Sequence, residues 1–251
     1  EPLDNYFPLQ HSSRDNKVIV AQYGMNSIAD LGLLKIDILG LKNLSILEEV
    51  REKIKETKGF EIDFDKISLD DKKTFDLYQK AETTAIFQLE SPGMKRCLKE
   101  LKPTCFEDIV AIVALHRPGP MEWIPEFILR KHKKKKVEYL HPKLESILEG
   151  TYGIALYQEQ IIEIAKKLAG FSPGQADLFR KAIGKKIHKI IIQEKEHFIQ
   201  GCFKNEISKK LAEEIFDKII QPFAEYGFNK SHAVCYALIG YWTAYLKANY
   251  P

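Results

Sequence analysis

Residues 91–120, SPGMKRCLKELKPTCFEDIVAIVALHRPGP, contain two short runs of helical character, and each run ends at a proline-bearing turn. Proline disfavours the helical conformation in the residue before it, so Pro103 and Pro118 mark the two ends. Almost every segment after Gly59 has the same helical character. We therefore expect a mainly α fold with a small β portion (α+β), in which the helical region is large and irregular.

Capping residues predict where other helices begin and end, because they satisfy the free backbone groups at helix termini. We expect a helix over 41–58 that stops at Gly59, and a second helix in YQEQIIEIAKKLAGF, residues 157–171, that stops at Gly170. The predicted starts are Ser68 with Asp71 in a capping-box-like arrangement, Ser172 followed by Pro173, and Ser231 for the last helix. The segment RKHKKKK, residues 130–136, is expected to be a solvated loop because it is too charged to pack.

The N-terminal residues predict only a fragment of a sheet. VIVAQY, residues 18–23, is typical of an edge strand, and LLKIDIL, residues 33–39, alternates so that Asp37 lies on the polar face. A carboxylate in an apolar run needs a cation, a hydrogen-bond donor or water, and the local sequence leaves these alternatives open. A stable sheet normally needs more than two strands, so we expect the chain to begin inside a domain.

Composition and residue spacing argue against a structural zinc protein, a membrane-spanning protein and a secreted protein. The 38 Lys and Arg residues nearly balance 35 Asp and Glu residues, and the net charge is +3. The four cysteines have no spacing suited to structural zinc, which favours a reduced cytoplasmic location. No apolar run approaches the ~20 residues that cross a bilayer, and the first ten residues lack the regions of a signal peptide, so no membrane partner is expected.

Two clusters are candidate binding sites. LFRKAIGKK, residues 178–186, is expected to gather basic groups along one helix edge, with Leu178 and Phe179 toward the core. Such an edge suits a polyphosphate or a nucleic-acid backbone, although a solvated basic face is equally compatible. EYGFNKSHAVCYALIGYW, residues 225–242, places aromatic, amide, cationic and imidazole groups at one helix start, which indicates either a binding site or a hydrogen-bonded surface.

These clusters and the segments between them resemble the alpha subunits of bacterial DNA polymerase III, the C-family replicative polymerases. The resemblance runs from about Leu33 to Pro251, and GLKNLSI after Asp37 favours the DnaE-type branch. The motifs that carry it are KIDILGLKNLSIL, FQLES, ALHRPGPM, YGIALYQEQ, FRKAIGKK and YGFNKSHAVCYAL. By this resemblance residues 1–58 are the C-terminal part of the palm domain, and residues 59–251 are part of the fingers domain.

The resemblance implies DNA-directed DNA polymerase activity, in which two Mg²⁺ ions held by three palm aspartates promote dNTP addition to a primer 3′-hydroxyl. Asp37 matches the third aspartate, as a catalytic and metal-binding residue. The other two form an upstream D-x-D pair in the family that this sequence does not contain. We therefore expect the chain alone to be inactive and not to bind the two ions.

The resemblance also implies nucleotide-binding residues. Cations for the triphosphate are expected from Arg180, Lys181, Lys185 and Lys186, with Arg117 in the same region. The sugar or base is expected against Asn229, Lys230, Ser231 and His232. Lys181 stands where the family often has a second arginine, so the resemblance does not imply a bidentate contact with phosphate at this position.

Implied partners are primer-template DNA and dNTP and, in the holoenzyme, the sliding clamp, clamp loader and proofreading subunit. The alternative is a non-catalytic helical module that binds nucleic acid or protein. An upstream D-x-D pair in the full gene would favour the enzyme.

Overall fold

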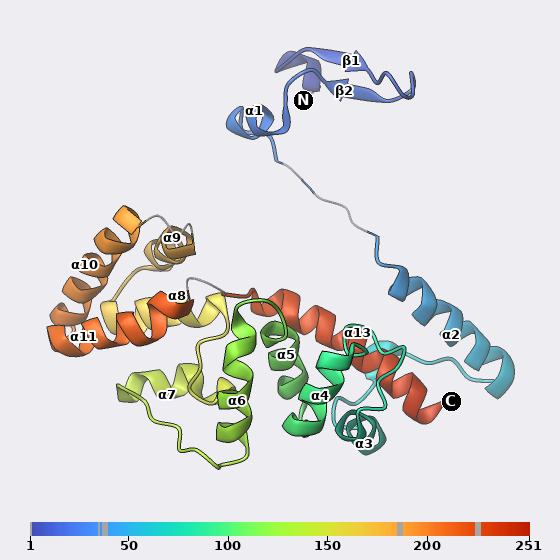
Figure 1. Cartoon of the computed structure of the whole chain (residues 1–251). Coiled ribbons are helices and arrows are strands. Elements are labelled where there is room, and N and C mark those ends of the chain that lie inside the picture. The colour runs from blue at the N-terminus through green and yellow to red at the C-terminus, as the bar shows by residue number, and fades with distance from the viewer. Residues whose placement is uncertain (1, 35, 37–39, 185–187, 224–226) are drawn as a thin grey trace. The chain divides into compact units, whose positions relative to one another are not determined.

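The computed structural model describes residues 2–34, 36, 40–184, 188–223 and 227–251. The chain divides into two compact units, residues 1–42 and 43–251, and each is described by itself. Figure 1 shows a β-hairpin in the first unit and helices in the second. The predicted class, mainly helical with a small β portion, is confirmed.

The first unit has a two-stranded antiparallel sheet in its described part. Strands β1 (Leu9–His11) and β2 (Ile19–Ala21) pair Gln10 with Val20, and β2 lies within the predicted edge strand. The predicted strand over 33–39, with Asp37, falls mainly outside the described residues. Leu34 and Ile36 are described, and they are exposed and belong to no strand. The other two elements are η1 (Leu3–Asn5) and α1 (Met25–Asp30).

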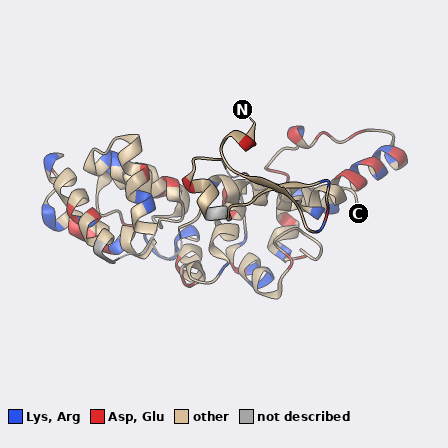
Figure 2. Ribbon diagram, turned by 90° about the horizontal axis from the view of Figure 1, so that it is seen from above, with Lys and Arg blue, Asp and Glu red and all other residues tan. Residues whose placement is uncertain are grey.

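The second unit is built from helices and short helical turns, and both basic and acidic residues are distributed along them (Figure 2). No helix in the described residues is long and apolar enough to cross a membrane. The elements are α2 (Lys42–Lys58), η2 (Phe64–Lys66), α3 (Lys72–Lys80), α4 (Pro92–Leu101), α5 (Phe106–Leu115), η3 (Pro120–Trp123), α6 (Ile124–Lys131), α7 (Pro142–Leu148), η4 (Glu149–Thr151), α8 (Gln158–Ala169), α9 (Pro173–Gly184), α10 (His188–Lys204), α11 (Lys209–Ile215), the π-helical η5 (Phe216–Ile220), α12 (Gln221–Phe223) and α13 (Lys230–Asn249).

Two hydrophobic cores hold the second unit together. The first core joins α3, α4 and α5 to the length of α13, where Tyr241 is fully buried. The second core joins α7, α8, α9, α10 and α11, with Phe179, Phe198 and Phe216 at its centre. Residues 154 and 156–157, just before α8, belong to the first core, whereas the buried face of α8 itself belongs to the second. The start of α8 is therefore a junction between the two cores.

The C-terminal ends of α2 and α8 and the start of α9 are close to their predicted positions, but the start of α3 is not. Gly59 and Gly170 end α2 and α8 with positive φ angles, and Ser172 caps α9 through the Gln175 amide. Helix α3 is capped by Asp71, whose carboxylate accepts from the Thr74 amide at 2.8 Å. Ser68 lies too early to cap α3, and its carbonyl instead accepts from the Tyr241 hydroxyl at 3.0 Å.

The basic segment at residues 130–136 is only partly a solvated loop, so that prediction is wrong for its first two residues. Arg130 and Lys131 form the last turn of α6 and are largely buried. The Lys131 ammonium lies 2.8 Å from the carboxylate of Asp108, which is 2% exposed. Buried charges are tolerated when they are paired in this way, which the run of cations alone does not reveal.

Candidate functional site

The start of α13 is capped by Asn229. Its side-chain oxygen accepts from the His232 amide at 2.8 Å, and its own backbone is extended. Ser231 lies inside the first turn, so the predicted Ser231 cap is wrong. A capping residue must stand just outside the helix to reach the amide three residues later, and Asn229 meets that condition.

The turn before α13 is joined by backbone hydrogen bonds to the segment that leads into α8. Phe228 donates its amide to the Leu156 carbonyl at 3.2 Å, and its carbonyl accepts from the Gln158 amide at 2.8 Å. Gly227 precedes it, and a Cβ there would lie 2.2 Å from the ring of Phe223, which is buried. Only glycine fits at this position, because a ring in the second core cannot withdraw easily.

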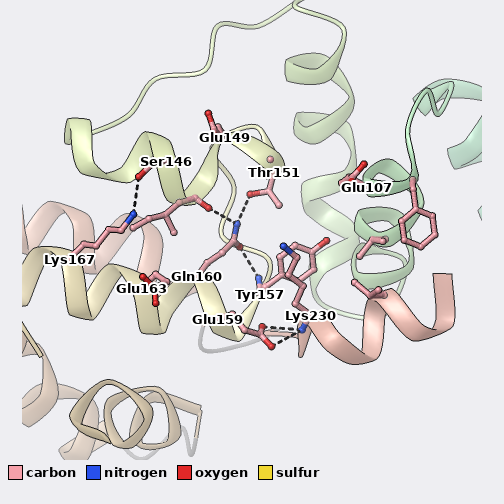
Figure 3. Close-up of a pocket in the computed structure, with 15 residues that line it drawn as sticks. Glu107, Ser146, Glu149, Thr151, Tyr157, Glu159, Gln160, Glu163, Lys167 and Lys230 are labelled. Atoms are coloured by element: carbon pink, nitrogen blue, oxygen red, sulfur yellow. Dashed lines mark hydrogen bonds between the residues drawn. The ribbon is translucent and has the colours of Figure 1, made fainter. Parts of the chain in front are cut away.

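Glu159 fixes the same two segments through its side chain. Its carboxylate accepts from the Lys230 backbone amide at 3.0 and 3.2 Å, as Figure 3 shows. It also accepts from the Asn229 carboxamide nitrogen at 3.1 Å. The first free amides of a helix carry partial positive charge, so a carboxylate is favourable there. The Lys230 ammonium lies 5.6 Å from the centre of the Tyr157 ring.

Phe228 brings Arg117 and His232 together. The Arg117 guanidinium lies 4.2 Å from the centre of the Phe228 ring, and its Nε donates to the Ala114 carbonyl at 3.0 Å. Burial lowers the pKa of this guanidinium, which still leaves it protonated at neutral pH. The His232 ring lies 5.5 Å from Phe228 and 4.1 Å from Tyr236. A cation and three rings thus surround the exposed α13 start.

The α9 cations are held by one carboxylate and by α8. Asp177 accepts from Arg180 Nε at 3.0 Å and Nη2 at 2.8 Å, and its other oxygen lies 2.7 Å from the Lys181 ammonium. Lys181 and Arg180 lower the pKa of Asp177. Arg180 Nη1 also donates to the Gln158 side-chain oxygen at 3.1 Å. Phe179 is buried as predicted, whereas Leu178 is 66% exposed, contrary to the prediction.

The structure therefore brings together some of the residues that were predicted to bind the nucleotide. Arg117, Asn229, Lys230 and His232 meet around Phe228, and Arg180 reaches the same place through Gln158. Ser231 and Lys181 are exposed at the edges of these two groups. Asp37, Lys185 and Lys186 lie outside the described residues. Sequence reasoning missed Gln158 and Glu159, although YQEQ was one of the motifs that carried the resemblance.

A pocket of about 590 Å³ adjoins this arrangement between α5, α7, α8 and α13 (Figure 3). Gln160 is built into its wall, where its side chain accepts from the Leu156 and Tyr157 amides and donates to Thr151 Oγ1. Two lysines and four carboxylates line the pocket: Lys167, Lys230, Glu107, Glu149, Glu159 and Glu163. This excess of negative charge disfavours a triphosphate there.

The described residues do not fit a metal site. Nowhere in the described ranges do three or more His, Cys, Asp or Glu side chains come close enough to hold a metal ion. Two Mg²⁺ ions need several carboxylate oxygens in one place.

Comparisons with known proteins agree with the resemblance. Residues 43–206 match the family described as "Bacterial DNA polymerase III alpha subunit finger domain". Relatives named "DNA polymerase III subunit alpha" are 52% identical over 251 residues in Bacillus subtilis (strain 168) and 49% identical over 251 residues in Halalkalibacterium halodurans. A third, from Staphylococcus aureus (strain COL), is 47% identical over 250 residues.

The chain belongs to the bacterial DNA polymerase III alpha subunit family and contains its finger domain. The match to each of these three relatives covers 100% of the chain, which spans 22% of the length of the Bacillus and Halalkalibacterium relatives and 23% of the Staphylococcus relative.

Proposed function

We propose that this chain supplies the nucleotide-binding fingers and part of the palm of a DNA-directed DNA polymerase that acts on primer-template DNA and dNTP. The observation that supports the proposal is the convergence of Arg117, Arg180 and the α13 start around Phe228 and the first turn of α8. Cations, amides and rings in one exposed place match the phosphates, sugar and base of a nucleotide.

The proposed roles follow the chemistry of each group. Arg180 and Lys181, with Lys185 and Lys186, bind the triphosphate and neutralise the charge that develops on it during transfer. Arg117 supports the same region through Phe228. Asn229, Lys230, Ser231 and His232 lie against the sugar and base, where the His232 ring, packed on Tyr236, discriminates deoxyribose from ribose by contact.

Asp37 is proposed to contribute one carboxylate to the Mg²⁺ ions of the complete subunit. We further propose that the remaining ligands come from the rest of the subunit and that the chain alone has no polymerase activity. The proposed division is a palm part at 1–58 and a fingers part at 59–251. The proposed setting is the cytoplasm, with the sliding clamp, clamp loader and proofreading subunit as holoenzyme partners.

Arg180→Ala in a complete subunit tests the phosphate role. We expect kcat/KM for single dNTP insertion to fall on the order of 100-fold, because one positioned cation is lost. Lys210→Ala in α11, an exposed lysine away from the site, is the control and should leave insertion unchanged. Equal kinetics for wild type and Arg180→Ala would remove Arg180 from the nucleotide site.

His232→Ala tests the sugar role in the same assay. We expect the preference for dNTP over rNTP to fall on the order of tenfold, because an apolar contact of a single ring is lost. The measurement is the ratio of kcat/KM for a matched dNTP and rNTP opposite one template base. An unaltered ratio would contradict the assignment.

A further inference from the structure

The proposed nucleotide contacts are divided between the two hydrophobic cores. Arg180 projects from α9, whose Ala176, Phe179 and Ile183 are buried in the second core. Asn229 and His232 stand at the start of α13, which contributes buried residues such as Ala233 to the first core. The distance between the two groups therefore depends on how the cores are held together.

Gln158, the first residue of α8, holds the α9 side. Its side-chain oxygen accepts from Arg180 Nη1, while Asp177 accepts from Nε and Nη2 of the same guanidinium. The planar fork of an arginine has a fixed donor geometry, so acceptors on two of its edges leave it little freedom to rotate. The backbone amide of Gln158 meanwhile donates to the Phe228 carbonyl.

Glu159, the next residue, holds the α13 side. It accepts from the Asn229 carboxamide nitrogen, and the oxygen of that carboxamide caps the His232 amide. Both ends of the Asn229 side chain are thus occupied, which fixes its orientation. Glu159 also accepts from the Lys230 amide. These hydrogen bonds hold the first turn of α13 in a fixed position relative to α8.

We infer that Gln158 and Glu159 are positioning residues that set the spacing between the Arg180 guanidinium and the start of α13. They act through Arg180 and Asn229 rather than by contact with the nucleotide. This inference rests on the proposed nucleotide site and adds to it the element that joins its two halves.

Single-nucleotide insertion kinetics of the complete subunit test the inference. We expect Gln158→Ala and Glu159→Ala each to raise KM for dNTP about tenfold, with a smaller change in kcat. Glu159→Gln should restore most of the wild-type KM, because an amide oxygen still accepts from Asn229 and Lys230. Glu163→Ala, one turn later in α8, removes a carboxylate that pairs with Lys166 and should leave KM unchanged.

A double-mutant cycle separates positioning from general loss of structure. Since Gln158 acts through Arg180, the variant Gln158→Ala/Arg180→Ala should be no worse than Arg180→Ala alone. Additive effects in the cycle would overturn the inference for Gln158. A KM for Glu159→Gln as high as that for Glu159→Ala would overturn it for Glu159, since charge and not geometry would then matter.

The same set of variants distinguishes an error in the positioning roles of Gln158 and Glu159 from an error in the proposed nucleotide site. If Arg180→Ala and His232→Ala leave insertion unchanged, the nucleotide site itself is wrong. If those variants impair insertion but Gln158→Ala and Glu159→Ala do not, only the positioning role falls. Should Glu159→Ala fail to fold, as judged by its thermal unfolding, the cycle and Glu159→Gln still decide.

Discussion

The two halves of the candidate site are held in different ways. On α9, Arg180 and Lys181 pair with Asp177, which lies three and four residues earlier on the same helix. At the α13 start, Asn229 and Lys230 bind Glu159, which lies 70 and 71 residues earlier in the chain. The ion pairs of the α9 half are therefore local to one helix, with one further side-chain hydrogen bond from Arg180 to Gln158 of α8, whereas the Glu159 contacts of the α13 half form only when α8 and α13 have come together.

The largest expected change in the free energy of unfolding comes from the buried face of α9, and its exposed face serves as the comparison. Phe179→Ala should lower the free energy of unfolding by about 3–5 kcal/mol, because it opens a cavity between Phe198 and Phe216. The neighbouring Leu178→Ala, at a side chain that is 66% exposed, should change it by less than about 0.5 kcal/mol. Urea unfolding followed by circular dichroism measures both, and similar losses would contradict the burial of Phe179.

A pair of glycine variants compares the two helix starts directly. Gly227→Ala places a Cβ against the Phe223 ring and should destabilise the chain by about 1–3 kcal/mol. Gly174→Ala in the first turn of α9 meets no atom within 4 Å and should stabilise the chain by roughly 0.5–1 kcal/mol. Thermal unfolding reports both, and a neutral Gly227→Ala would show that the α13 start is less tightly built than α9.

The smallest expected effect concerns the local pair on α9. Asp177 has a pKa below its ordinary value because of Lys181 and Arg180. Its pairing therefore stabilises the folded chain above the unfolded pKa, about 3.9, and this contribution is lost as the pH falls through the lower folded pKa. The side chain is 38% exposed, so the effect is small.

Urea midpoints of wild type and Asp177→Asn at pH 7 and pH 3 measure this contribution. We expect the wild type to have a slightly higher midpoint at pH 7 and the two midpoints to approach each other at pH 3. A difference that grows on acidification would contradict the sign of the pKa shift.

The sequence predicts local features of the site and fold well and long-range features poorly. Helix class, the Gly59 and Gly170 stops and the Ser172 cap depend on neighbours within one turn, and they were predicted. The Ser231 and Ser68 caps were wrong because Asn229 and Asp71 also carry capping side chains and stand nearer the true starts. Helical periodicity of 178–183 could not tell that Leu178 faces solvent.

The features that could not be predicted depend on pairs of residues that are far apart in the sequence. The burial of Lys131 depends on Asp108, 23 residues away in sequence, so a run of cations gave no sign of it. Gln158 and Glu159 likewise have ordinary polar side chains whose partners, Arg180, Asn229 and Lys230, lie 22 to 71 residues later. Spacing rules for one helix cannot connect such residues.

The backbone pairing of Phe228 with residues 156 and 158 has a consequence for sequence change during evolution. Both hydrogen bonds use main-chain atoms, so a change of side chain at 158 or 228 does not by itself remove a donor or an acceptor of this pairing. Proline is the exception at 158 and 228, where the donated N–H would be lost. The main-chain pairing of the two helix starts thus tolerates a change of side chain at 228, whereas the positions of Arg180 and Asn229 still require the side chains of Gln158 and Glu159.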